Sequence, residues 1–314
     1  MPLISTKPMF ERALAETFAV GAFNVNNMEI IQGIADAAAA KKIPLILQIS
    51  KGARAYARIE YLRHLIDATL ECYPDLPIAM HLDHGDSFEL AKQCVDDGFT
   101  SVMIDGSHLP LAENIELTKQ VVDYAHPRGV MVEGELGRLA GVEEHVSVAE
   151  KDAIFTDPDE AVQYVEKSGV DSLAVAIGTS HGAYKFAGEP YLDLERLGRI
   201  QEKLPGFFLV LHGASSVIPE FVDLCNRYGG ELPNARGVPE EMIAEAVRKF
   251  NLVKVNIDTD LRLALTAMIR KEFAENPGNF DPRKYLGPAR EAIQKMVERK
   301  VEMLGCGGKG EGLG

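Results

Sequence analysis

The stretch PIAMHLDHG, residues 77–85, is an apolar run that ends abruptly in imidazole and carboxylate side chains. Seven similar short runs, rich in apolar and β-branched residues, recur along the 314-residue chain, and stretches with helical periodicity separate them. Two of those stretches, residues 30–41 and 111–124, predict amphipathic helices. Apolar strands that alternate with helices predict a parallel sheet covered on both faces. The eight predicted strands span residues 18–25, 44–50, 77–83, 101–105, 130–136, 172–178, 207–213 and 252–258.

Eight strand–helix units predict an α/β fold that closes into a TIM (β/α)8 barrel, with an open doubly wound sheet as the alternative. No G-x-G-x-x-G motif follows the first predicted strand, which disfavours an open dinucleotide-binding sheet. Nearly every predicted strand also ends in polar side chains. TIM barrels gather their active site from the C-terminal ends of many strands, whereas an open sheet uses one switch point. The sequence therefore favours one TIM-barrel domain over residues 1–314.

Composition narrows the classes of function. The chain is 46% hydrophobic, and it contains no linker-like tract and no apolar run long enough for a membrane span. Its start lacks the pattern of a secretory signal, so we expect a cytoplasmic protein. The four cysteines share no C-x-x-C spacing, which predicts reduced thiols. A formal charge of −14 argues against nucleic acid or anionic membranes as partners, and it requires any site for an anionic ligand to be locally cationic.

Three histidines lie at or just beyond the ends of predicted strands: His84, His181 and His212. Three imidazoles around an open fourth position form a catalytic zinc site. The alternative is that each is an ordinary hydrogen-bonding loop histidine. Asp83 directly precedes one of them and could transfer protons beside a metal, or it could instead cap the next helix in competition with Asp86 and Ser87.

Small-residue turns after neighbouring strands are candidates for phosphate recognition. They are residues 213–216, residues 256–259, and residues 178–182 with Lys185 nearby. Backbone N–H groups and hydroxyls in such turns bind anions. The long, charged and glycine-rich stretch 135–158 is typical of a lid over the site, with a solvated surface excursion as the alternative.

Six segments taken together resemble class II fructose-bisphosphate aldolases, and the shorter class IIB branch in particular. The resemblance covers essentially the whole chain, in the expected order. The segments are AFNV (22–25), HLDHG (81–85), VEGELG (132–137), GTSHG (178–182), LHGAS (211–215) and NIDTD (256–260).

The resemblance implies that His84, His181 and His212 hold a catalytic Zn²⁺ ion and that Asp83 is the acid/base. It implies a second divalent ion on Asp105 and Glu135, and a monovalent cation, Na⁺ or K⁺, near the backbone of residues 182, 213 and 215. A loop carboxylate, Glu143 or Glu144, would remove the carbon-bound proton.

The resemblance also assigns substrate contacts. Arg262 and Arg283 would bind the 6-phosphate, and Arg283 would reach in from a neighbouring subunit, which implies a homodimer or homotetramer. Ser50 would contact the glyceraldehyde 3-phosphate half. The other substrate-binding candidates, chiefly for dihydroxyacetone phosphate, are Asn24, Gly182, Lys185, Gly213, Ala214, Ser215, Asn256, Ile257, Asp258 and Thr259.

The implied activity is reversible aldol cleavage of fructose 1,6-bisphosphate into dihydroxyacetone phosphate and glyceraldehyde 3-phosphate, through a zinc-stabilised enediolate, in glycolysis and gluconeogenesis. Tagatose-1,6-bisphosphate aldolase is the nearest alternative, and Asp258 leans toward fructose because a small residue is expected there in tagatose enzymes. A non-catalytic phosphosugar-binding protein and a zinc hydrolase are more distant alternatives. A last helix over residues 288–304 could support a dimer, and the glycine-rich end, residues 305–314, is predicted to be disordered.

Overall fold

Eight parallel strands close into a barrel in this computed structural model, which describes residues 3–143, 146–148, 154–183 and 191–313. The first strand, β1, pairs with both β2 and β11, so the sheet has no open edge. The predicted TIM barrel and all eight predicted strands are confirmed. The barrel strands are β1 (Val20–Asn24), β2 (Leu45–Ser50), β3 (Ile78–Gly85), β4 (Ser101–Ile104), β5 (Met131–Leu136), β8 (Ser172–Val175), β10 (Phe208–Leu211) and β11 (Leu252–Ile257).

Burial on both faces explains why these strands are apolar throughout. Every residue of β1, β2, β4, β5, β8 and β11 is buried, because one face lines the barrel and the other packs under helices. The polar side chains of these strands lie mainly on the inward face, at the barrel mouth or in the centre of the barrel. This burial makes polar inward-facing residues costly unless they are hydrogen-bonded or paired.

Helices alternate with the strands and surround them, and local signals set their ends. Asn27 accepts a hydrogen bond from the N–H of Ile30 at the start of α2, and Ser87 does the same for Leu90 at the start of α5. The helices are α1 (Thr6–Glu16), α2 (Met28–Lys41), α3 (Lys51–Ala57), α4 (Ile59–Cys72), α5 (Phe88–Asp96), α6 (Leu111–Ala125), α7 (Pro158–Ser168), α8 (Leu194–Lys203), α9 (Pro219–Arg227), α10 (Glu240–Lys249), α11 (Thr259–Glu275) and α12 (Pro282–Leu304), with a short 3-10 turn over His126–Arg128.

A second, small sheet lies outside the barrel. Its strands are β6 (Ala140–Glu143), β7 (Val146–Val148) and β9 (Ser180–His181). β6 and β7 form an antiparallel hairpin within the predicted lid stretch, and β6 pairs in parallel with β9. The lid stretch is therefore joined to the backbone of the segment that carries His181.

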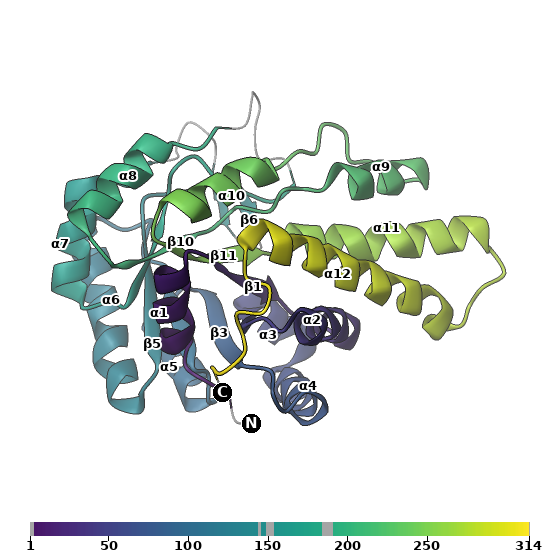
Figure 1. The fold of residues 1–314 in the computed structure, drawn as a ribbon, viewed down its shortest axis with the longest axis horizontal. Helices are drawn as coiled ribbons and strands as arrows, with labels where there is room; N and C mark the ends of the chain where they lie inside the picture. Colours follow the sequence, from purple (N-terminus) through teal and green to yellow (C-terminus); the bar gives the residue numbers. More distant parts are fainter. Residues whose placement is uncertain (1–2, 144–145, 149–153, 184–190, 314) are drawn as a thin grey trace.

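The helices α11 and α12 form a long hairpin that extends well beyond the barrel (Figure 1). α12 begins at Pro282, six residues before the helix start expected at residue 288, and continues through Pro288. Asp281 caps its first turn by accepting from the N–H of Arg283, and Pro282 occupies the first helical position, where its missing N–H costs nothing. These two signals, rather than Pro288, start the helix.

The glycine-rich C-terminal segment is ordered over residues 305–313, so the expectation of a disordered tail is wrong for this part. The backbone N–H groups of Gly308 and Gly310 donate to the carbonyls of Lys41 and Lys42, and Cys306 is buried. A Cβ at residue 310 would lie 2.7 Å from the carbonyl carbon of Ile43. Glycine serves close backbone approach here rather than flexibility.

The four cysteines are free thiols; Cys94, Cys225 and Cys306 are buried and Cys72 is exposed. The prediction of reduced thiols is therefore confirmed. None of the helices in the described ranges is long and apolar enough to cross a membrane.

We expect Gly33→Ala to destabilise the protein although alanine is the better helix former. A Cβ at residue 33 of α2 would lie 2.8 Å from Ile293 Cγ2 and 2.9 Å from the carbonyl oxygen of Arg290 in α12. Overpacking of this kind costs about 1–3 kcal/mol, which outweighs a helix-propensity gain of about 1 kcal/mol. Thermal denaturation should show a melting temperature lower by roughly 2–6 °C.

Gly287→Ala is the matched control, because it lies in α12 with no atom within 4 Å of the added Cβ. It should keep or slightly raise the melting temperature. A Gly33→Ala protein as stable as Gly287→Ala would contradict the close packing of α2 on α12.

Candidate active site

The end of β3 carries two consecutive functional side chains that both face the barrel mouth. In a regular strand, neighbouring side chains point to opposite faces. Here the pairing of β3 with β4 shifts register between Leu82 and Gly85, and His84 has a left-handed backbone with φ of 45°. Such an irregularity re-aims a side chain. It brings His84 Nε2 to 4.0 Å from Asp83 Oδ1.

Asp83 is buried and held by two amides from other strands. Asn24 Nδ2 donates to its Oδ2 at 2.6 Å, and Asn256 Nδ2 lies 3.2 Å from its Oδ1. Gln48 in turn donates to the Asn24 side-chain oxygen at 2.5 Å. Because Ser87 caps the next helix, the alternative role of Asp83 as that cap does not apply.

His84 and His212 face each other at the centre of the site. His84 Nε2 lies 2.9 Å from His212 Nδ1, and the rings are nearly perpendicular at 86°. The other nitrogen of each ring contacts a carboxylate: His84 Nδ1 is 3.0 Å from Asp105, and His212 Nε2 is 2.7 Å from Glu133. An ionised carboxylate only accepts, so the nitrogens that face Asp105 and Glu133 carry protons, and in the neutral form of each ring the facing nitrogen then carries a lone pair.

The electrostatics of the site support this assignment. Burial would raise the pKa of Asp105, but hydrogen bonds from His84 and Ser107 outweigh it and lower that pKa. Burial likewise opposes ionisation of Glu133, yet the charge of Lys254 and the His212 hydrogen bond lower its pKa. Burial lowers the pKa of His212, so the ring is neutral. Both carboxylates are ionised at neutral pH.

Two facing imidazole lone pairs are suited to a metal ion. Two ligands of a tetrahedral zinc, each at about 2.0–2.1 Å from the ion, lie about 3.3 Å apart, close to the distance seen here. Asp83, His84 and His212 offer ligand atoms that all lie within 4.8 Å of one another. Carboxylates behind both rings match the usual support of metal-bound histidine. The residues present therefore fit a divalent ion.

His84, Asp105 and Glu135 form a second group with the same spacing of ligand atoms. His84 Nδ1 is 3.8 Å from Glu135 Oε2. Glu135 follows Glu133 by two residues on β5, so both point into the barrel. The two groups share His84, which places both predicted metal positions at one end of the barrel.

Sequence reasoning missed a buried layer beneath this site. Lys254 Nζ lies 3.0 Å from Glu133 and 3.3 Å from His81 Nε2, and all three side chains are buried. Burial, together with the nearby charge of Lys254, holds the pKa of His81 well below its usual value, and its Nδ1 lies 2.9 Å from the Ser101 hydroxyl. The signal was present: Lys254 interrupts an apolar strand two residues before Asn256, on the same inward face.

The turn after β10 lies beside the segment that carries His181. Gly213 has φ of 61°, and a Cβ there would lie 2.9 Å from the Ser180 backbone, so only glycine suits this approach. The Ser215 hydroxyl accepts from the N–H of Asp258 at 3.4 Å, which joins the turn to the end of β11. Val217 has φ of 50°, a conformation that costs a β-branched residue about 1–2 kcal/mol.

Other predicted substrate residues line the same mouth. Ser50 ends β2 and caps α3, and Thr259 is the first residue of α11. The side chains of Ala214 and Ile257 lie in the hydrophobic core, so only their backbones can face a ligand. Asn256 Oδ1 is buried and accepts no hydrogen bond from the described residues.

Arg262 and Asp258 form a two-point ion pair at the rim. Arg262 Nε donates to Asp258 Oδ1 at 2.8 Å, and its Nη2 lies 2.6 Å from Oδ2. The guanidinium is half exposed. The pair orients both side chains. It also partly neutralises the charge of Arg262, which is predicted to bind phosphate.

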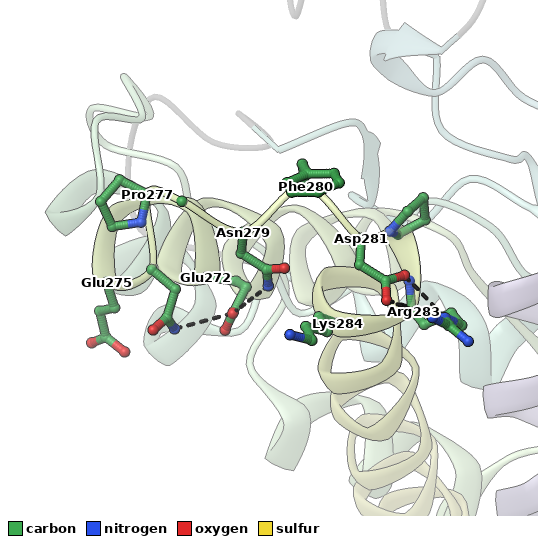
Figure 2. Close-up of a pocket in the computed structure, with 11 residues that line it drawn as sticks. Glu272, Glu275, Pro277, Asn279, Phe280, Asp281, Arg283 and Lys284 are labelled. Atoms are coloured by element: carbon green, nitrogen blue, oxygen red, sulfur yellow. Dashed lines mark hydrogen bonds and ion pairs between the residues drawn. The ribbon is translucent and has the colours of Figure 1, made fainter.

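Arg283 is not brought to the mouth by its own chain. It lies at the far tip of the α11–α12 hairpin, where it pairs with Asp281 (Figure 2), and its side chain is 90% exposed. α11 starts at the mouth with Thr259 and has 17 residues, which corresponds to a length of about 25 Å. Any contact of Arg283 with a barrel mouth must therefore be made in another copy of the chain.

Four predicted residues can be placed only partly or not at all. Glu143 ends β6, and Gly141 is in register with His181 of β9, so the backbones of the lid and of the third histidine lie side by side. The side chains of Glu143 and His181 lie outside the described part, as do Glu144 and Lys185 entirely.

Comparison with known proteins agrees with this geometry. The family model described as class II fructose-bisphosphate aldolase matches residues 4–309. A fructose-bisphosphate aldolase of Giardia intestinalis is 50% identical over 310 residues, covering 98% of this chain and 94% of the relative. One of Thermus caldophilus is 49% identical over 307 residues, covering 98% and 99%. The crystal structure of the YdjI aldolase from Escherichia coli K12 superposes with a TM-score of 0.77 at 30% identity, covering 98% and 100%.

We expect Asp105→Asn to weaken zinc binding about 10- to 100-fold, because the neutral amide supports the His84 ring less strongly and removes a nearby negative charge. Competition with a chromophoric zinc chelator measures this affinity directly. Asp123→Asn is the matched control, since Asp123 is exposed on α6. Equal zinc affinities for the two variants would contradict the orienting role of Asp105.

Proposed function

The chain belongs to the class II fructose-bisphosphate aldolase family, and we propose that it catalyses the reversible cleavage of fructose 1,6-bisphosphate into dihydroxyacetone phosphate and glyceraldehyde 3-phosphate. The observation that carries this proposal is the pair of facing nitrogens, His84 Nε2 and His212 Nδ1, beside the anchored carboxylate of Asp83. The curated relatives are named for fructose bisphosphate, so the tagatose alternative is not favoured.

This family is metal-dependent, and we assign zinc to His84 and His212 together with His181. A zinc ion bound there would act as a Lewis acid for the carbonyl and hydroxyl oxygens of the substrate. Neutral imidazoles suit this task because they leave the ion its full charge. Asp105 and Glu135, which lie beside the His84 ring, are the proposed second divalent site, and the backbone at residues 182, 213 and 215 is the proposed Na⁺ or K⁺ site.

Asp83 is the proposed acid/base for the hydroxyl that becomes the aldehyde. Its carboxylate holds or accepts that proton, and Asn24 and Asn256 fix its orientation from two sides. Asn256 Oδ1 can accept from a second substrate hydroxyl. Asp83 and the two amides that hold it all lie on barrel strands. Little rearrangement of these side chains is therefore needed when the substrate binds.

A second carboxylate must act on the carbon-bound proton from the other side of the substrate. We assign it to the lid, as Glu143 or Glu144. The pairing of β6 with β9 supports this role, because it ties the lid backbone to the His181 segment. A base on a lid acts only after closure, when water is excluded.

The phosphate groups are assigned to the turns at the mouth. The turn at residues 213–215, with Gly182 and Thr259, offers backbone N–H groups and hydroxyls to one phosphate. Lys185, which follows the 178–182 turn, is assigned to the same phosphate, and Ser50, Arg262 and Arg283 are assigned to the other end of the substrate. These local donors offset the overall negative charge of the chain.

Arg283 makes this assignment depend on oligomerisation. Its position at the hairpin tip supports a homodimer or homotetramer in which the tip enters the mouth of a neighbouring subunit. The reaction is part of phosphosugar metabolism, glycolysis and gluconeogenesis, and its proposed compartment is the cytoplasm.

We expect fructose 1,6-bisphosphate cleavage to be lost on treatment with EDTA and restored by Zn²⁺. A coupled assay should be run with tagatose 1,6-bisphosphate in parallel, where a lower kcat/KM is expected. Undiminished cleavage after complete metal removal, checked by elemental analysis, would rule out the three-histidine metal site. Faster cleavage of tagatose 1,6-bisphosphate would reverse the assignment of the substrate.

Subunit mixing tests the two halves of the proposed site together. Asp83→Asn should lower kcat about 10²- to 10⁴-fold, and Arg283→Ala should raise KM for the bisphosphate. In a mixed dimer, one mouth has an intact Asp83 and receives an intact Arg283 from the other subunit. Co-refolding equal amounts should therefore recover roughly a quarter of wild-type activity at low substrate concentration.

Arg262→Ala co-refolded with Asp83→Asn is the control, because Arg262 lies at the mouth of its own chain, and it should give no comparable recovery. A mixture of Asp83→Asn and Arg283→Ala that only averages the two separate activities would exclude the shared site.

A further inference from the structure

We propose that Lys300, near the C-terminal end of α12, is a positioning residue for the phosphate-binding turn after β10. It acts through Asp260, the second residue of α11. This inference rests on the proposed function, in which residues 213–215 bind a phosphate group of the substrate. It gives the C-terminal end of α12 a role within its own subunit, whereas Arg283, at the start of the same helix, is assigned to a neighbouring subunit's mouth.

Lys300 lies at the centre of a buried charge cluster. Its side chain is 1% exposed, and its Nζ lies 2.8 Å from Asp260 Oδ2 and 2.9 Å from Glu240 Oε1. It also donates to the Ser216 hydroxyl. The Asp260 side chain is fully buried. The cluster joins α12, the first turn of α11 and the first turn of α10 to the residue that follows Ser215.

Asp260 connects this cluster to the backbone of the turn. Its Oδ2 accepts from the N–H of Ser216 at 3.0 Å, and its Oδ1 accepts from the N–H of Ile218 at 3.0 Å. The residue between these two N–H groups is Val217, whose φ of 50° is unfavourable for a β-branched residue. Asp260 therefore holds the two amides that flank the strained position.

Charge neutralisation makes this clamp possible. Burial would raise the pKa of Asp260, but the charge and hydrogen bond of Lys300 outweigh burial and lower it, so the carboxylate accepts at both oxygens. Without the ammonium, a fully buried carboxylate would have to be protonated or move toward water. Either change removes an acceptor from the Ser216 or the Ile218 N–H and lets the strained turn relax.

The turn transmits its position directly to the proposed phosphate site. Ser215 precedes Ser216, its hydroxyl accepts from the N–H of Asp258, and its carbonyl accepts from the N–H of Val238. A Cβ on Gly237 would lie 2.3 Å from the Ser215 carbonyl oxygen, so the backbone of Gly237 packs directly against the turn. The Lys300 cluster thus sets where the N–H groups at residues 213–215 point.

The test is Lys300→Met, which removes the charge and keeps a similar length. We expect KM for fructose 1,6-bisphosphate and the dissociation constant of inorganic phosphate, measured by equilibrium dialysis, both to rise roughly tenfold. The value of kcat should stay within about threefold, because Asp83 and the metal ligands do not contact the cluster. Lys295→Met is the matched control, since Lys295 is exposed on the same helix.

A purely structural role would lower the melting temperature of Lys300→Met and leave both KM and phosphate binding at wild-type values, and that outcome would overturn the proposal. If Lys300→Met does not accumulate as folded protein, the double variant Lys300→Met with Asp260→Asn removes both buried charges. It should fold and show the same weaker phosphate binding, and phosphate binding at wild-type strength in it would equally overturn the proposal.

This experiment distinguishes a failure of the proposed function from a failure of the positioning role of Lys300. A wild-type chain that binds phosphate but cleaves no bisphosphate would overturn the proposed function, while weaker phosphate binding in Lys300→Met would still support the positioning role. Conversely, normal cleavage with unchanged phosphate binding in Lys300→Met would overturn the positioning role alone.

Discussion

Two imidazole nitrogens that face each other at 2.9 Å impose the constraint on which the rest of this site depends. Each is fixed from behind by an ionised carboxylate, Asp105 for His84 and Glu133 for His212. Facing lone pairs repel, and a cation between them removes that repulsion. The left-handed backbone of His84 serves the same end, because without it the ring would point away from Asp83 and from its partner.

The buried carboxylate of Glu133 requires a positive charge nearby, and Lys254 supplies it inside the barrel. Glu133 is buried in the barrel, where an unpaired charge would be costly, and the ammonium of Lys254 lies directly against it. The site nevertheless stays rich in carboxylates, which suits a divalent cation and opposes an anionic substrate. This charge agrees with the proposal that phosphate groups bind away from these acids, at the turn after β10 and the rim arginine Arg262, where backbone N–H groups and a guanidinium supply positive charge.

The strands and the residues at their ends could be predicted from the sequence because burial on both faces makes each strand a continuous apolar run, interrupted only where it reaches the mouth. That rule alone predicted which side chains gather at the mouth of the barrel, among them Asp83, His84, Asp105, Glu135 and His212. Tertiary features could not be predicted in this way. The shift at the end of β3, the pairing of Lys254 with Glu133 and the docking of the C-terminal glycines all depend on partners distant in the chain. The C-terminal glycines led to the wrong expectation of a disordered tail, because glycine is favoured both in flexible segments and where two backbones approach closely.

Closure of the barrel and construction of the mouth share one element, α12. Its end accepts a hydrogen bond from the N–H of Ala19, next to β1, the tail beyond it binds the end of α2, and Lys300 within it reaches the turn after β10. α12 thus connects the start of β1 to the segment that follows β10, close to the point where β1 pairs with β11 and closes the barrel. The same helix carries both contacts. The proposed role of Lys300 thus links stability and substrate binding through α12, whereas the proposed metal ligands His84 and His212, supported by Asp105 and Glu133, lie outside that link.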